Sequence, residues 1–163
     1  ILTDIALRQN DRALAANPNE LNALIQKGYA MARMAKASTD PATAWGDVRK
    51  QFVKVNKIEP DHPIPLIEYY ESFVKQGTAP PKVALDGLFW AHRLAPFDQN
   101  VRWSIANEQF SAGQFRKALD TLAPLANNPH QSELADKAKE LITRTKDELA
   151  KTEQKPAIVS TGG

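Results

Sequence analysis

The chain has 163 residues, which suits one domain of ordinary size with an apolar core. Hydrophobic residues make up 42% and charged residues 25%, close to soluble globular averages, so neither a disordered nor a membrane-embedded class is favoured. The net charge is only +2, with lysines and arginines scattered among acidic residues, so a nucleic-acid partner is not expected. Cysteine is absent, which excludes disulfides, thiolate catalysis and cysteine-bound zinc but leaves the cellular compartment open.

The apolar runs are far shorter than the roughly 20 residues that a membrane-spanning helix needs, so we expect no membrane insertion. The N-terminus also lacks the basic stretch and apolar core of a signal peptide. The sequence begins with Ile1 instead of methionine and enters a helical pattern at once. We therefore interpret it as a fragment of a longer protein.

Apolar residues recur at helical spacing and do not alternate, which predicts helices and no strand. The predicted helices cover, in chain order, residues 1–16, 21–36, 42–58, 64–76, 81–94, 99–112, 115–127 and 131–151. Pro18, Pro60 and Pro96 each close an amphipathic stretch, because proline cannot continue a helix. Segments 37–41 and 77–81 carry serine, threonine or aspartate ahead of a proline that opens the next helix.

A repeating register runs through these helices. One small or β-branched residue lies twelve residues before each of the three prolines, and a second register position lies ten residues after. The first set is Ala6, Val48 and Ala84, and the second is Gly28, Tyr70 and Ala106. Small side chains are needed where two helices cross at close range, so the register predicts stacked helix pairs.

The register resembles that of the tetratricopeptide repeat (TPR), a helix–turn–helix unit of about 34 residues. Residues 84–88 and 118–122 match the family's Ala-x-x-x-aromatic element, with leucine in the aromatic position, and residues 113–115 match its turn. The resemblance covers roughly residues 1–127.

The sequence also departs from the family pattern. The opening tryptophan of the repeat is replaced by Leu24, Leu66 and Arg102, and the bulky Tyr70 occupies a position for a small residue. The prolines lie 42 and 36 residues apart, more than one period. We place the additional residues between the two helices of each repeat.

The resemblance implies an all-α fold. It is an α-solenoid of antiparallel helix pairs, with about three TPR-like repeats, a leading half repeat and a C-terminal capping helix. The capping helix at 131–151 has one apolar face and one charged face. We predict a TPR-like helical repeat domain over residues 1–151 and a flexible C-terminal tail over residues 152–163.

Candidate chemistry is sparse. His62, His92 and His130 lack the spacing of metal ligands; we interpret the first and last as turn residues and expect His92 to face solvent. No phosphate-binding loop, nucleophile elbow or dinucleotide fingerprint occurs. Glu68 and Glu71 share a helix face, an arrangement that general acid–base catalysis can use, but solvated helices produce such pairs routinely. We therefore predict no enzymatic activity, no metal and no cofactor.

In TPR arrays the first helices of successive repeats line a concave groove, and the resemblance implies that partner-binding residues lie there. They combine amide, charged and aromatic side chains. The predicted set is Asn22, Ile25, Gln26, Tyr29, Arg33, Ile67, Glu71, Lys75, Trp103, Asn107 and Phe110, with Glu68 beside them. Positive residues are too sparse for the subtype that binds acidic peptide termini.

The aromatic residues leave two interpretations open. Those of the groove set either anchor a partner or pack under the insertions and against an upstream repeat. We expect Trp103 to project into the groove, so that replacing it weakens binding and not folding. Phe52 is predicted to be in the core. The adjacent Phe89 and Trp90 face different directions, so one of them must turn outward or toward a neighbouring repeat.

Two functions are consistent with this pattern. The first is a protein–protein interaction module that binds a peptide or a helix in the concave groove. The second is an accessory C-terminal repeat region of a larger enzyme, such as a bacterial hydrolase, that braces it or recruits substrate. The expected partner is another protein or peptide, or the rest of the parent chain, and the localisation stays unknown.

Overall fold

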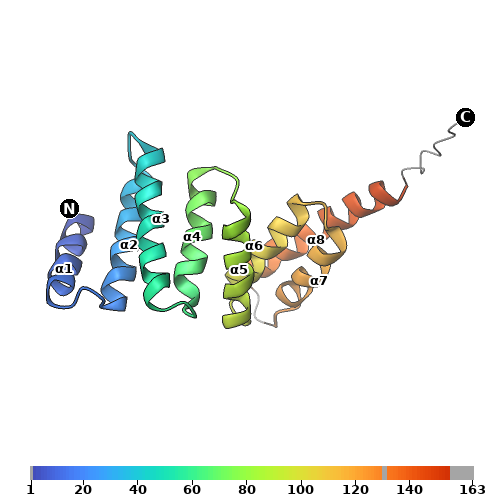
Figure 1. The fold of residues 1–163 in the computed structure, drawn as a ribbon. Coiled ribbons are helices and arrows are strands. Elements are labelled where there is room, and N and C mark those ends of the chain that lie inside the picture. The colour runs from blue at the N-terminus through green and yellow to red at the C-terminus, as the bar shows by residue number, and fades with distance from the viewer. Residues whose placement is uncertain (1, 130–131, 155–163) are drawn as a thin grey trace, which may run out of the picture. The chain divides into compact units, whose positions relative to one another are not determined.

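In the computed structural model of the protein, the described residues are 2–129 and 132–154, and within these ranges they form eight α-helices and no strand (Figure 1). The helices are α1 (Leu2–Ala16), α2 (Leu21–Ala35), α3 (Pro41–Ile58), α4 (Pro63–Gln76), α5 (Lys82–Leu94), α6 (Gln99–Ser111), α7 (Phe115–Ala126) and α8 (Glu133–Glu153). Every predicted helix is present, with ends within two residues of the predicted ones. The all-α fold class is confirmed.

Polar residues that precede the helices explain where several of them begin. Asp40 precedes α3, and its carboxylate accepts a hydrogen bond of 3.2 Å from the backbone N–H of Thr43. Equivalent caps are made by Glu20, His62, Asp98 and Ser132. Each cap satisfies N–H groups that have no partner in the first turn. Pro81 precedes α5 and Gln114 precedes α7 without a side-chain cap.

The chain divides into two compact units. Unit 1 contains α1–α5; α1 packs on α2, α2 on α3, α3 on α4 and α4 on α5, and α2 also contacts α4. Unit 2 contains α6–α8, in which α7 packs against both α6 and α8. The domain boundary predicted after residue 151 stays a prediction. Helix α8 continues to Glu153, and residues 155–163 of the predicted tail lie outside the described residues.

Apart from Ala6, which is half-buried, the register residues occupy buried positions of the helices. Val48, Ala84, Ala106 and Ala118 are all at most 1% exposed. Gly28 leaves space for the Phe52 ring, because a Cβ atom at position 28 would lie only 2.5 Å from Phe52 Cζ. A close approach of α2 and α3 therefore depends on the absence of a side chain at this position.

The eight additional residues of the first repeat lie around the predicted turn between its two helices, and most of them lengthen the adjoining helix ends. Gly28 and Val48 are 20 residues apart, whereas the equivalent Ala106 and Ala118 are 12 apart. Helices α2 and α3 are longer than α6 and α7 by two and six residues, respectively. The connection between α2 and α3 is longer than that between α6 and α7 by only two residues. The other six extra residues extend the helix ends at this turn. Helix α2 continues for seven residues beyond Gly28 and α3 begins seven residues before Val48, compared with five beyond Ala106 in α6 and three before Ala118 in α7.

Each unit has its own core. In unit 1, α2 and α3 contribute Ala32, Ala35, Trp45, Val48 and Phe52, and Leu24, Ile25 and Val55 form a second cluster. In unit 2, Ala106, Leu122, Leu125, Ala138 and Leu141 join all three helices. Among the described residues, no helix has both the length and the apolarity to cross a membrane.

Candidate partner-binding surface

The predicted partner-binding residues are divided between the two compact units. In unit 1, Asn22, Gln26, Tyr29 and Arg33 are spaced four, three and four residues apart on α2, so they share one helix face. Asn22, Gln26 and Arg33 are exposed, and Tyr29 is half-buried. The amides of Asn22 and Gln26 make no side-chain hydrogen bond within the described part of the chain, which leaves them available to a ligand.

The neighbouring helix α4 continues this surface. Glu68, Glu71 and Lys75 are spaced three and four residues apart and therefore share a face of α4, which contacts α2. Glu68 and Glu71 are half-buried, and Lys75 is exposed. We call the combined surface the polar face, defined by Asn22, Gln26, Tyr29, Arg33, Glu68, Glu71 and Lys75.

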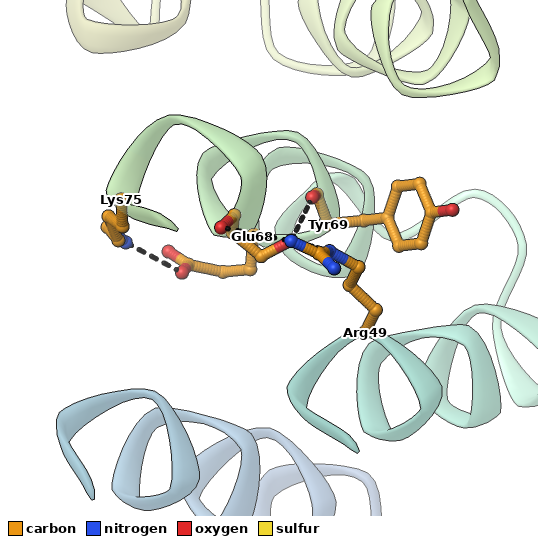
Figure 2. Close-up of polar contacts among 5 residues, drawn as sticks. Arg49, Glu68, Tyr69 and Lys75 are labelled. Carbon is orange, nitrogen blue, oxygen red and sulfur yellow. Dashed lines mark hydrogen bonds and ion pairs between the residues drawn. The ribbon is translucent and has the colours of Figure 1, made fainter. Parts of the chain in front are cut away.

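Glu68 of α4 takes part in two electrostatic interactions, one with α2 and one within α4. The pKa of Tyr29 is raised above its ordinary value, mainly by burial and further by the negative charge of Glu68. Tyr29 on α2 therefore lies near Glu68 on α4 and stays a neutral hydroxyl. Lys75 Nζ lies 3.2 Å from Glu68 Oε2, as Figure 2 shows. The half-buried carboxylate of Glu68 thus has a partner on its own helix.

Ile25 does not belong to this surface. It is 4% exposed and packs with Leu24 and Val55, so its side chain is not available to a partner. Successive residues of a helix are rotated by about 100°, which carries Ile25 from the side of Gln26 into the core. Ile67 is half-buried, as its neighbour Glu68 is.

The three predicted residues of unit 2 lie on one face of α6, but they contact their own unit. Trp103 and Phe110 are half-buried and pack against the core cluster of α6, α7 and α8. The Phe110 ring lies 5.7 Å from that of Phe115 and 5.2 Å from the guanidinium of Arg144. Asn107 donates a 2.8 Å hydrogen bond from its amide to the Trp103 carbonyl.

This arrangement changes the interpretation of Trp103. We expected its ring to project away from the packed side of α6, yet it lies against the core of unit 2. Its replacement must therefore reduce stability, whatever it does to binding. The alternative stated for the groove aromatics was packing under the insertions and against an upstream repeat. Trp103 and Phe110 instead pack against the core of their own unit.

Arg49 is a positioning residue that the sequence did not indicate. Figure 2 shows Arg49 extending from α3 toward α4. Its Nε donates a 3.0 Å hydrogen bond to Ser72 Oγ, and its Nη2 donates to Gln76 Oε1. Its guanidinium also lies 3.9 Å from the centre of the Phe73 ring. Partial burial lowers the pKa of Arg49. These contacts fix the position of α4, and hence of Glu68 and Lys75, against α3.

The histidines and acidic residues considered as metal ligands do not form a site among the described residues. Across residues 2–129 and 132–154, no group of three or more His, Asp or Glu side chains is arranged to hold a metal ion. His62 caps α4 by accepting a hydrogen bond from the Ile64 backbone N–H, in line with a turn residue. His92 is half-buried and not solvent-facing, because it lies one turn after the fully buried Leu88. His130 lies outside the described residues.

Phe52 is fully buried, as predicted. The adjacent Phe89 and Trp90 are both exposed, at 43% and 40%. Only one of them was expected to point outward or toward a neighbouring repeat. The Trp90 ring is covered in part by Arg93, whose guanidinium lies 4.8 Å from its centre. The exposed surface of α5 therefore includes two aromatic side chains, where the sequence pattern predicted one.

Comparison with known proteins identifies the fold. No family model matches the sequence, and no curated protein matches it. The structure is similar to that of TTC0263, a thermophilic TPR protein of Thermus thermophilus, with a TM-score of 0.64 and 18% identity over 91% of this chain and 74% of that chain. Two structures of MamA are similar with TM-scores of 0.60 and 0.58, at 16% and 17% identity. They cover 93% and 96% of this chain and 91% and 88% of the MamA chains.

At these identities the similarity concerns the fold alone. The chain has a TPR-like helical repeat fold, as its register predicted.

Proposed function

We propose that the chain is a protein-interaction module that binds an extended peptide or a helix on the polar face. The observation that supports this proposal is the exposed row of hydrogen-bonding side chains on two adjacent first helices of TPR-like repeats. The row stands on a packed core, because Ile25 and Leu24 beneath it are buried. A rigid support of this kind lowers the entropy lost when a ligand is bound.

The amide spacing fits a peptide backbone. Asn22 and Gln26 lie four residues apart on α2, which is about 6 Å along the helix axis. Alternate residues of an extended chain are separated by roughly 6.6 Å. Each side-chain amide offers one acceptor and a donor group, so the pair can bond to the backbone of alternate ligand residues.

The charges of the polar face favour a ligand of mixed character. Arg33 is exposed and makes no ion pair within the described part of the chain, whereas Lys75 is held by Glu68. Because positive and negative groups alternate, neither a strongly acidic nor a strongly basic peptide is preferred. Tyr29 contributes an aromatic surface fixed by edge-to-face packing on Phe52, with ring centres 6.0 Å apart.

Peptide selection tests this function. A display library of random unstructured peptides is selected against the full chain, and the dissociation constants of the selected peptides are measured by calorimetry. Asn22→Ala/Gln26→Ala should weaken binding by about 2 kcal/mol, roughly thirtyfold, because two hydrogen bonds are lost. The double variant Gln99→Ala/Asn100→Ala removes the same amide types from exposed positions of α6 and should leave binding unchanged.

Equal weakening by both double variants would show that the amides act nonspecifically. Binding that neither variant affects would exclude the polar face as the docking surface.

A further inference from the structure

A small apolar cavity opens on unit 1 between α3, α4 and α5, away from the residues of the polar face. Its volume is about 160 Å³, and it is lined by Phe52, Val53, Asn56, Pro65, Leu66, Tyr69, Val83 and Gly87. Phe52 is fully buried, whereas Val53 and Val83 are 40% and 63% exposed. An apolar cavity of about 150 Å³ accommodates benzene. One aromatic or branched aliphatic side chain therefore fits.

A second cavity, of about 410 Å³, adjoins the first and shares Val53 and Tyr69 with it. Its other lining residues are the cations Arg49, Lys50, Lys54 and Lys57. None of the residues that line either cavity is acidic. An apolar recess is thus bordered by a row of positive charge on α3.

Two of these cations, Lys54 and Lys57, are not held by any other described side chain. Arg49 is held by Ser72 on α4, and Lys50 pairs with Asp47 at 2.9 Å. Lys54 and Lys57 are exposed and make no ion pair with any described residue. Their ammonium groups can therefore attract an anion at the edge of the apolar cavity.

The two surfaces lie on different sides of α4. In Figure 2 the Tyr69 ring points away from the Glu68–Lys75 pair, toward the side from which Arg49 approaches. Tyr69 lines both cavities, whereas Glu68 and Lys75 belong to the polar face. A ligand in the cavities therefore need not displace one on the polar face.

We propose that this surface of α3, α4 and α5 is a second docking site, which binds an acidic peptide through one apolar anchor side chain. The anchor occupies the apolar cavity, and the flanking carboxylates meet Lys54 and Lys57. From Lys50 to Lys57 the row is about 10 Å long, which corresponds to roughly three residues of an extended peptide. An anchor with acidic residues on either side matches this length.

The shape of the surface favours a peptide over a lipid bilayer. Binding in a membrane interface requires apolar side chains that project from a basic helix face. Here the apolar element includes a recess whose deepest residue, Phe52, is fully buried. A recess of this kind receives a side chain from the partner, as anchor pockets of protein interfaces do.

Fluorescence anisotropy with a defined probe tests the proposal. The probe is a labelled heptapeptide with one central phenylalanine and three glutamates on each side, added to the full chain at low salt. Two control peptides replace the phenylalanine by serine or all glutamates by glutamine. We expect saturable binding of the probe, at least tenfold weaker binding of each control peptide, and loss of affinity as salt screens the charges.

Two protein variants, each with a matched control, test the two cavities separately. Lys54→Glu/Lys57→Glu should weaken probe binding at least tenfold. Lys117→Glu/Lys146→Glu, which makes the same change of net charge at exposed positions of unit 2, should leave it within twofold. Gly87→Leu fills the apolar cavity and should also weaken binding tenfold, whereas Gly87→Ala, whose Cβ lies 3.6 Å from Leu66 Cδ2, should not. Thermal melting of every variant confirms that it is folded.

Three results would overturn the proposal. Equal losses in the two charge-reversal variants would reduce the effect to nonspecific attraction. An unchanged affinity of folded Gly87→Leu would show that no anchor enters the cavity. Binding to phosphatidylglycerol vesicles that depends on Lys54 and Lys57, without binding of the peptide, would assign the surface to a membrane. None of these variants changes a residue of the polar face, so each outcome is independent of the function proposed above.

Discussion

Two glycines of unit 1 provide a matched test of helix packing, because alanine should have opposite effects on stability at Gly28 and Gly87. Both lie inside helices, where replacing glycine by alanine stabilises by about 0.5–1 kcal/mol when space is available. At Gly87 the nearest atom to an added Cβ is Leu66 Cδ2 at 3.6 Å, an ordinary contact. We therefore expect Gly87→Ala to raise the free energy of unfolding by about 0.5–1 kcal/mol.

At Gly28 the same methyl group meets an obstacle. It would lie 2.5 Å from Phe52 Cζ and 2.8 Å from Cε1. Phe52 is fully buried and packs with Tyr29, Trp45 and Val48, so a shift of its ring toward the apolar cavity beside it would break these contacts. Overpacking of this kind costs about 1–3 kcal/mol, which exceeds the helix gain and leaves Gly28→Ala less stable by roughly 0.5–2 kcal/mol.

Urea unfolding followed by far-UV circular dichroism measures both effects in the same compact unit. The double variant Gly28→Ala/Phe52→Leu serves as a control, because the smaller side chain should relieve part of the clash and give a favourable coupling energy. If Gly28→Ala stabilised the protein as much as Gly87→Ala, the close approach of α2 and α3 would not depend on a small residue. The repeat register would then be wrong.

Three further substitutions test individual elements. Trp103→Ala should lower stability by about 2 kcal/mol, less than for a fully buried tryptophan, in urea unfolding; an unchanged midpoint would place the ring in solvent. Ala118→Glu should cost several kcal/mol in the same assay, since it introduces charge and volume at a fully buried position, and a change under about 0.5 kcal/mol would contradict this packing. Hydrogen bonding to Thr43 lowers the pKa of Asp40, so its contribution is complete above the ordinary aspartate pKa and is lost as pH falls through the lowered value. Asp40→Asn should flatten the pH dependence of stability in that acidic window, and identical acid unfolding curves would refute the assignment.

The helices could be predicted because their signals are local and redundant. Helical periodicity, the prolines after each pair and caps such as Asp40 all indicate the same boundaries, which the structure places within two residues. The small-residue register was equally readable, since Ala84 and Ala118 sit where helices cross. The TPR-like fold follows from these two patterns together.

The partner surface was harder to predict because it requires the rotation of each helix to within one residue. A shift of one position turns a side chain by about 100°, which separates the buried Ile25 from the exposed Gln26. Trp103 shows the same difficulty on α6, where its ring contacts the core of unit 2. The family pattern gave no warning, because arginine replaces tryptophan at the preceding position.

Contacts between distant residues left no signal at all. Arg49 and Ser72 are 23 residues apart, and no periodicity marks an arginine that joins two helices. The division into two compact units and the cavities beside α3, α4 and α5 likewise depend on tertiary packing, which cannot be predicted from the pattern of a single sequence.

The most direct test of the proposed function is to map a bound peptide on the isotope-labelled chain by nuclear magnetic resonance. On titration with a selected peptide, we expect the side-chain amide signals of Asn22 and Gln26 to shift, together with the backbone signals of Tyr29, Glu68 and Lys75. Signals of the exposed α7 residue Lys117 should stay in place. Shifts that spare α2 and α4 while the peptide binds would contradict the assignment of the polar face as the docking surface.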